Sequence, residues 1–136
     1  MTIDELIENF DLLEDWEDKY RYIIDLGAKM DALPENLKTD DWKVHGCQSQ
    51  VWLIPTVTMK DGQKYLDFQG DSDAAIVRGI VAIILMIFAH KTPREIKEIA
   101  VENIFAKLGL QDHLSPSRRN GLAAMAEKIR YYASTL

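Results

Sequence analysis

The sequence predicts an α+β domain in which a small antiparallel sheet is covered by helices on one face. Helix signals fill residues 1–34, a strand–turn–strand pattern occupies residues 51–69, and helix signals resume after Asp71. The chain has 136 residues, of which 47% are hydrophobic, and no internal repeat. That length and composition predict one globular domain over residues 1–136.

The first 34 residues predict two helices. Thr2 and Glu5 have the spacing of a capping box, and apolar residues follow them at helical intervals. We expect Asp15 to cap a second helix. This helix should end at Leu33-Pro34, because proline disfavours the helical conformation in the residue before it.

A β-hairpin is predicted next. Residues 51–59 are rich in β-branched side chains and predict a strand, in which Pro55 indicates an edge or a bulge. Residues 60–63, Lys-Asp-Gly-Gln, have the composition of a hairpin turn. Residues 64–69 are then the returning strand.

The longest apolar run, residues 74–89, predicts a helix buried within the domain, because it is apolar on all sides. We expect Asp71-Ser72-Asp73 to cap it. The run is shorter than the roughly 20 residues that a membrane-spanning helix needs, so we expect no membrane segment.

The last 45 residues predict three more helical segments. Thr92-Pro93-Arg94-Glu95 is a second capping box, with proline at the first helical position. A further short helix or turn is expected before Gly109. Residues 115–117, Ser-Pro-Ser, begin the last helix. Its expected apolar face consists of Leu122, Met125, Ala126, Ile129 and Tyr132.

The net charge of −6 is unevenly distributed along the chain. Residues 1–42 hold 13 acids and 4 bases, whereas the remainder holds 9 acids and 12 bases. An acidic front argues against nucleic acid as the main partner, because binding nucleic acid requires a basic surface. We interpret these acids as a solvated helix face in preference to a docking surface.

Cys47 is the only cysteine. A single thiol cannot form an internal disulfide, nor can it alone supply a structural zinc site or hold an iron–sulfur cluster. Lone cysteines are often buried. Here, however, Gly46 precedes the thiol and polar residues 48–50 follow it, which favours a turn beside the strand. The unpaired thiol and the absence of a secretory or transit sequence indicate the cytoplasm.

Three segments resemble the SufE family, the sulfur acceptors that partner cysteine desulfurases. They are Gly-Cys-Gln-Ser-Gln-Val-Trp at 46–52, Gln-Gly-Asp-Ser-Asp-Ala-Ala-Ile-Val-Arg-Gly at 69–79, and His-Leu-Ser-Pro-Ser-Arg-Arg-Asn-Gly-Leu at 113–122. Their order and spacing also fit, and the resemblance covers nearly the whole chain. It implies a SufE/IscU-like fold.

The resemblance further implies that Cys47 takes persulfide sulfur from a SufS-like or CsdA-like cysteine desulfurase and stimulates that enzyme. The sulfur would then pass to an iron–sulfur scaffold complex or to another acceptor. No cofactor is implied for this chain, since pyridoxal phosphate belongs to the desulfurase. An exposed apolar patch around the cysteine loop could support a weak homodimer.

Three further residues are candidates for the site. Arg118 could stabilise a thiolate or persulfide anion, or it could pair with Asp71 or Asp73 at a helix end. Asp73 is interpreted as a helix cap, with restraint of the cysteine loop as the alternative. His45 could act as a general base toward Cys47, although a solvent-facing role is favoured.

The sulfur needs protection between transfers, because an exposed thiol is open to oxidation. A loop that tucks it into an apolar pocket and turns it out on docking would give that protection. We expect Val51, Trp52 and Leu53 to line the pocket.

Two other functions remain open at this point. One is a cysteine hydrolase in which Cys47 pairs with His45 or His113. The other is an adaptor that activates another protein while Cys47 serves only a structural purpose. A cluster scaffold is rejected, because it would need about three cysteines.

Overall fold

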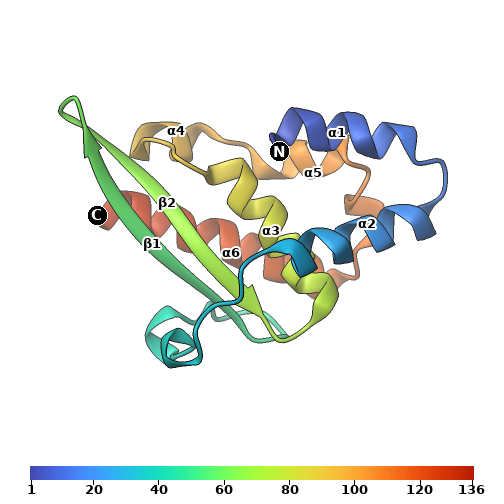
Figure 1. Ribbon diagram of the computed structural model, residues 1–136, viewed down its shortest axis with the longest axis horizontal. Coiled ribbons are helices and arrows are strands. Elements are labelled where there is room, and N and C mark those ends of the chain that lie inside the picture. Colours follow the sequence, from blue (N-terminus) through green and yellow to red (C-terminus); the bar gives the residue numbers. More distant parts are fainter.

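The computed structural model describes all 136 residues and confirms the α+β class. Its helices and strands, shown in Figure 1, are α1 (Ile3–Leu12), α2 (Trp16–Lys29), β1 (Val51–Lys60), β2 (Gln63–Ser72), α3 (Ala75–Phe88), α4 (Pro93–Glu98), α5 (Val101–Lys107) and α6 (Pro116–Thr135). Three short 3-10 turns join them: η1 (Glu35–Leu37), η2 (Asp40–Trp42) and η3 (Gln111–His113).

The sheet is the predicted hairpin. Strands β1 and β2 pair in antiparallel register from Val51 opposite Ser72 to Lys60 opposite Gln63. The turn residues Asp61 and Gly62 have φ values of 54° and 75°, as a two-residue hairpin turn requires. Helices α3 and α4 contact β2 and α6 contacts β1, which leaves the hairpin as a long arm along the helical layer (Figure 1).

The predicted helix starts are largely confirmed. The N-cap side chains that accept a backbone N–H of the first turn are Thr2, Asp15, Thr92 and Ser115. Thr92 and Glu95 form a complete capping box. At Thr2 only the bond from the Glu5 N–H to the threonine hydroxyl is formed, at 3.2 Å.

Helix α2 ends at Lys29 rather than at Leu33, which corrects the predicted boundary. The next residue, Met30, is extended, and its carbonyl accepts from Nη2 of Arg78 at 2.6 Å. The N–H of Leu33 in turn donates to Oδ2 of Asp71 at 3.1 Å. Hydrogen bonds to distant residues therefore satisfy the backbone groups that a longer helix would have used.

The prediction that residues 71–73 cap the buried helix is wrong. Its N-cap is Ala74, which makes no side-chain cap bond. Asp71 and Ser72 complete β2, which runs three residues beyond the predicted end. The carboxylate of Asp71 is 2% exposed and lies 3.4 Å from Nε of Arg78 and 3.6 Å from Nζ of Lys38.

Helix α3 is buried as predicted and forms the centre of the hydrophobic core. Its tightest contact is with α2, where Gly27 and Gly79 face the opposite helix. A Cβ at Gly79 would lie 2.1 Å from the carbonyl oxygen of Ile23. The two helices can therefore approach this closely only without a side chain there.

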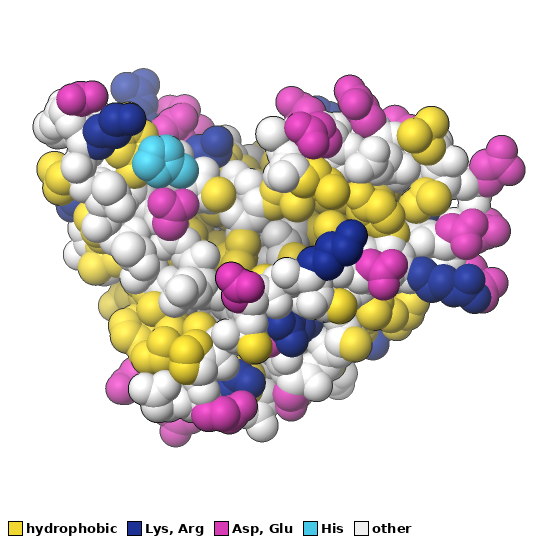
Figure 2. Space-filling model, viewed as in Figure 1, with side chains coloured by type: hydrophobic (Ala, Val, Ile, Leu, Met, Phe, Trp, Pro, Cys, Tyr) yellow, Lys and Arg dark blue, Asp and Glu magenta, His cyan; other side chains and the backbone are white.

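The acids of α1 and α2 are largely exposed, as a solvated helix face requires. Figure 2 shows acidic side chains at the right of the molecule, where α1 and α2 lie in Figure 1. No helix of the structure combines the length and the apolar character needed to cross a membrane.

Candidate functional site

The loop that carries Cys47 is closed at its base by β1. The N–H of Val44 donates to the carbonyl of Val51 at 2.8 Å, so the chain enters and leaves the loop at neighbouring points. Gly46 has a φ of 97°, a conformation that favours glycine. A Cβ there would also lie 3.3 Å from Cβ of Ala124 in α6. The predicted turn is therefore present and is pressed against α6.

Cys47 lies on this turn, but its sulfur faces inward. The residue is half-buried, and Sγ donates a hydrogen bond to the carbonyl oxygen of Gly121 in α6, at 3.6 Å. Burial raises the pKa of the Cys47 thiol, because the charged thiolate loses solvation. This geometry therefore shifts the balance toward the protonated thiol and away from the nucleophilic thiolate.

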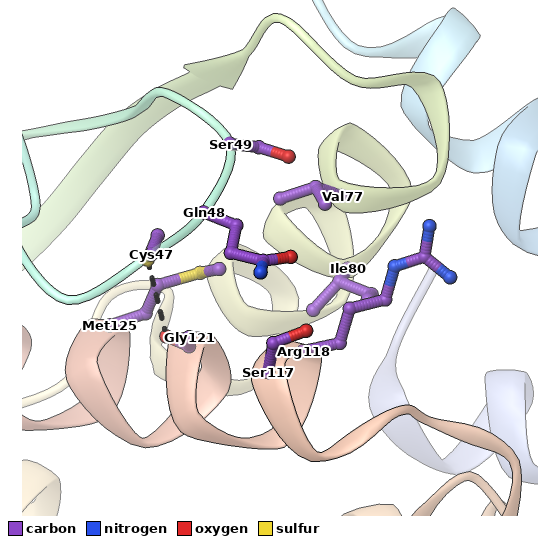
Figure 3. A pocket seen from close by; sticks show the side chains of 9 residues that line it. All are labelled: Cys47, Gln48, Ser49, Val77, Ile80, Ser117, Arg118, Gly121 and Met125. Carbon is purple, nitrogen blue, oxygen red and sulfur yellow. Dashed lines mark hydrogen bonds between the residues drawn. The ribbon is translucent and has the colours of Figure 1, made fainter.

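A cavity of about 80 Å³ opens beside the sulfur. Figure 3 shows its walls, which come from the cysteine loop, α3 and α6. The lining residues are Cys47, Gln48, Ser49, Val77, Ile80, Ser117, Arg118, Gly121 and Met125. The side next to α3 is apolar, whereas the loop and the first turn of α6 contribute polar groups.

The predicted lining by Val51, Trp52 and Leu53 is wrong. These residues belong to β1 and are nearly fully buried, but none of them borders the cavity. Val51 and Leu53 pack into the main hydrophobic core. The apolar wall is supplied instead by helix residues that lie far from Cys47 in the sequence.

Arg118 borders the cavity and makes none of the ion pairs of the structure, so the alternative of pairing with Asp71 or Asp73 is not realised. Its N–H donates to the Ser115 hydroxyl at 3.3 Å, which fixes it in the first turn of α6. In Figure 3 the guanidinium lies on the far side of the cavity from Cys47. A rotation of the side chain would be needed to bring it to the sulfur.

Asp73 is hydrogen-bonded to Gln50, at the end of the cysteine loop. Its carboxylate Oδ1 accepts from the N–H of Gln50 at 3.0 Å, and its own N–H donates to the carbonyl of Gln50 at 3.3 Å. Asp73 thus connects the loop to the start of α3 without capping that helix.

The two histidines considered as partners of Cys47 lie elsewhere. His45 is exposed and borders a separate hollow on the other side of the loop, beside Lys128 and Tyr131. His113 stacks on Trp16, with ring centroids 3.9 Å apart. The structure therefore contains no cysteine–histidine pair of the kind that a hydrolase would use.

Only Cys47 and Arg118 of the lining residues were candidates from the sequence. The other seven were not: Gln48, Ser49, Val77, Ile80, Ser117, Gly121 and Met125. Met125 was expected only as part of the apolar face of the last helix. The sequence could have pointed to Gly121. A glycine inside a predicted helix lowers the stability of that helix, so its presence indicates a packing or functional role.

Residues 4–133 match the SufE family, which is described as an Fe-S metabolism associated domain. An uncharacterized SufE-like protein of Rhizobium meliloti (strain 1021) is 46% identical over 129 residues, which cover 95% of this chain and 92% of that protein. Another from Rhizobium etli is 44% identical over 129 residues, covering 95% of this chain and 87% of the relative.

A solved structure is similar in fold. The solution structure of a hypothetical protein from Thermus thermophilus matches with a TM-score of 0.69 and covers 99% of this chain and 97% of its own. Its sequence identity is 18%, so this likeness concerns the fold alone.

Proposed function

Because the chain belongs to the SufE family, whose members serve cysteine desulfurases in sulfur transfer, we propose that Cys47 accepts persulfide sulfur from such an enzyme. The observation that carries the proposal is the position of this single thiol, on a loop and beside a cavity of about 80 Å³. That volume is several times the roughly 10–15 Å³ that a water molecule requires. It has room for the additional sulfur of a persulfide.

The transfer is a thiol exchange without net oxidation or reduction. The Cys47 thiolate attacks the outer sulfur of the donor persulfide and forms a new S–S bond. The S–S bond of the donor breaks, and the donor cysteine leaves as a thiolate. Removal of the persulfide frees that cysteine for another turnover, which accounts for stimulation of the desulfurase.

The thiol has to turn outward for this reaction. At rest its sulfur faces α6 and is preferentially protonated. A thiol–carbonyl hydrogen bond is weak, so docking of the donor enzyme can displace it. Once loaded, the loop returns and the apolar wall formed by Val77, Ile80 and Met125 protects the persulfide from oxidation.

The remaining roles follow from the same geometry. Arg118 would stabilise the persulfide anion after rotating toward the sulfur. Asp73 restrains the loop through Gln50. The stored sulfur goes on to an iron–sulfur scaffold complex or another acceptor. The proposal includes a cytoplasmic setting, supported by the single thiol without a disulfide partner.

Intact mass spectrometry tests the acceptor role. The protein is incubated with a cysteine desulfurase and L-cysteine, and we expect a mass gain of about 32 Da, one sulfur atom, on Cys47. The Cys47→Ser variant should fold but show no gain and no stimulation of the desulfurase. Full stimulation by protein alkylated at Cys47 would instead favour an adaptor.

A further inference from the structure

We propose that Gly121 is a positioning residue of the sulfur-acceptor site. Its lack of a side chain lets the Cys47 sulfur rest on α6 and keeps free the space that the second sulfur occupies after transfer. The inference rests on the proposed function, because it concerns the persulfide form of Cys47.

The backbone of α6 does not explain this glycine. Gly121 is buried in a regular stretch of the 20-residue helix, and its φ is not in the left-handed region. Glycine inside a helix lowers helix stability relative to alanine. Gly46 differs in this respect, since its φ of 97° by itself favours glycine. The reason for Gly121 must therefore lie in what it faces.

Gly121 faces Cys47. A Cβ built on Gly121 would have three atoms of Cys47 as its nearest neighbours: Sγ at 3.4 Å, Cβ at 3.8 Å and Cα at 3.9 Å. The carbonyl oxygen of Gly121 also accepts the hydrogen bond from Sγ. Both the missing side chain and the carbonyl of this residue are thus directed at the acceptor cysteine.

Loading changes what the site must accommodate. The hydrogen bond to Gly121 uses the proton of the thiol, and this proton is replaced by the transferred sulfur. The persulfide sulfur lies about 2.05 Å from Sγ, the length of an S–S bond. Since the carbonyl oxygen offers no donor, the added sulfur has to turn away from it and into the cavity that Gly121 borders.

A methyl group at position 121 would affect the two forms differently. At 3.4 Å from Sγ it makes an ordinary contact with the unloaded thiol. The added sulfur extends beyond Sγ and would meet the methyl group in part of its orientations. Alanine should therefore be tolerated before transfer, and it should disfavour the sheltered orientations of the added sulfur after transfer.

The test compares Gly121→Ala with Asn120→Ala, an exposed neighbour in the same helix that does not border the cavity. Each protein is loaded by a desulfurase with L-cysteine, separated from it, and exposed to a phosphine reductant. Intact mass follows the loss of the added sulfur. We expect Gly121→Ala to accept sulfur but to lose it about tenfold faster, as overpacking of a filled site predicts. Asn120→Ala should match the unchanged protein.

A rescue variant separates lost space from a general effect on the helix. Val77→Ala removes volume from the opposite wall of the cavity. Alone it should shorten the lifetime of the persulfide, because Val77 belongs to the protective wall. Added to Gly121→Ala it should lengthen that lifetime, because it returns the space that the methyl group takes. Equal lifetimes in Gly121→Ala and the unchanged protein would overturn the inference. Unfolding of Gly121→Ala would overturn it too, because the methyl would then clash with the unloaded thiol. If even the unchanged protein gains no sulfur, the proposed function fails instead.

Discussion

Asp73 and Gln50 are joined by two hydrogen bonds, one in each direction. The N–H of Gln50 donates to the Asp73 carboxylate at 3.0 Å, and the N–H of Asp73 donates to the Gln50 carbonyl at 3.3 Å. Gln50 is the last residue before β1, three positions after Cys47. The side-chain half of this connection can be removed by mutation, whereas the backbone half remains.

Asp73→Arg is expected to make the Cys47 thiol more accessible. The substitution removes the carboxylate acceptor. A hydrogen bond to a charged group contributes about 1.5–3 kcal/mol and a typical one about 0.5–1.5 kcal/mol. Because the bond to Asp73 is exposed, we expect the lower range, or about a twofold to tenfold change in loop opening. Alkylation of Cys47 by iodoacetamide under native conditions measures the change. No helix cap is lost in this variant, since Ala74 is the N-cap of α3.

Two controls isolate the hydrogen bond from the charge. Asp73→Asn keeps a side-chain oxygen that can accept from Gln50 and should react close to the unchanged rate. Asp25→Arg makes the same charge change on the exposed face of α2 and should also have little effect. An alkylation rate for Asp73→Arg that does not exceed these controls would show that Asp73 does not restrain the loop.

The alkylation of Cys47 should depend on pH with a midpoint above that of an unfolded cysteine, which is about 8.5. Burial raises the pKa of the folded thiol, so the reactive thiolate forms at higher pH. At a pH between the unfolded and the folded pKa, the Cys47 thiol therefore keeps its proton in the folded state and has lost it in the unfolded state. The stabilisation linked to Cys47 is complete below the unfolded pKa and decreases as pH rises through the folded pKa.

Rates of alkylation in folded and urea-unfolded protein, measured from about pH 7 to about pH 10.5 to bracket the unfolded value, check this prediction. A folded midpoint at or below the unfolded one would contradict a buried resting thiol. Cys47→Ser should remove the linked change in the free energy of unfolding at alkaline pH.

Arg78→Met should destabilise the fold more than Lys38→Met. Asp71 is 2% exposed and has both cations as partners, and Arg78 also bonds the carbonyl of Met30. Removing Arg78 leaves a buried carboxylate poorly compensated, which typically costs about 3–5 kcal/mol. Urea denaturation measures both free energies of unfolding. A smaller loss in Arg78→Met, or equal losses in the two variants, would show that Asp71 does not depend on Arg78.

The sequence was sufficient for the elements whose causes are local. Cap residues such as Asp15 and Ser115, the Asp61-Gly62 turn and the apolar run of α3 all act on neighbours in the chain, and each was predicted correctly. The family motif identified Cys47 for the same reason, since it is a contiguous string of residues.

What the sequence did not predict depends on contacts between distant segments. Asp71 looked like a helix cap, but its partners are Lys38 and Arg78, which only the fold brings together. The prediction of which residues line the cavity beside Cys47 was wrong for the same reason. Its apolar wall comes from α3 and α6, 30 or more residues away from Cys47, while the neighbouring Val51 is drawn into the core.

Arg118→Ala should slow persulfide formation on Cys47 more than Arg119→Ala. The two residues are adjacent in the first turns of α6 and carry the same charge, but Arg118 borders the cysteine cavity. Arg119 borders a different hollow, beside Leu114 and Leu122. A cation that reaches the sulfur favours the thiolate and the persulfide anion over their protonated forms. We expect the rate of the mass gain to fall by about tenfold for Arg118→Ala, which corresponds to roughly one pKa unit.

Arg118→Lys should recover part of the rate, because it restores the charge. Equal losses in Arg118→Ala and Arg119→Ala would mean that only the net charge near the start of α6 matters and that Arg118 makes no specific contact with the sulfur.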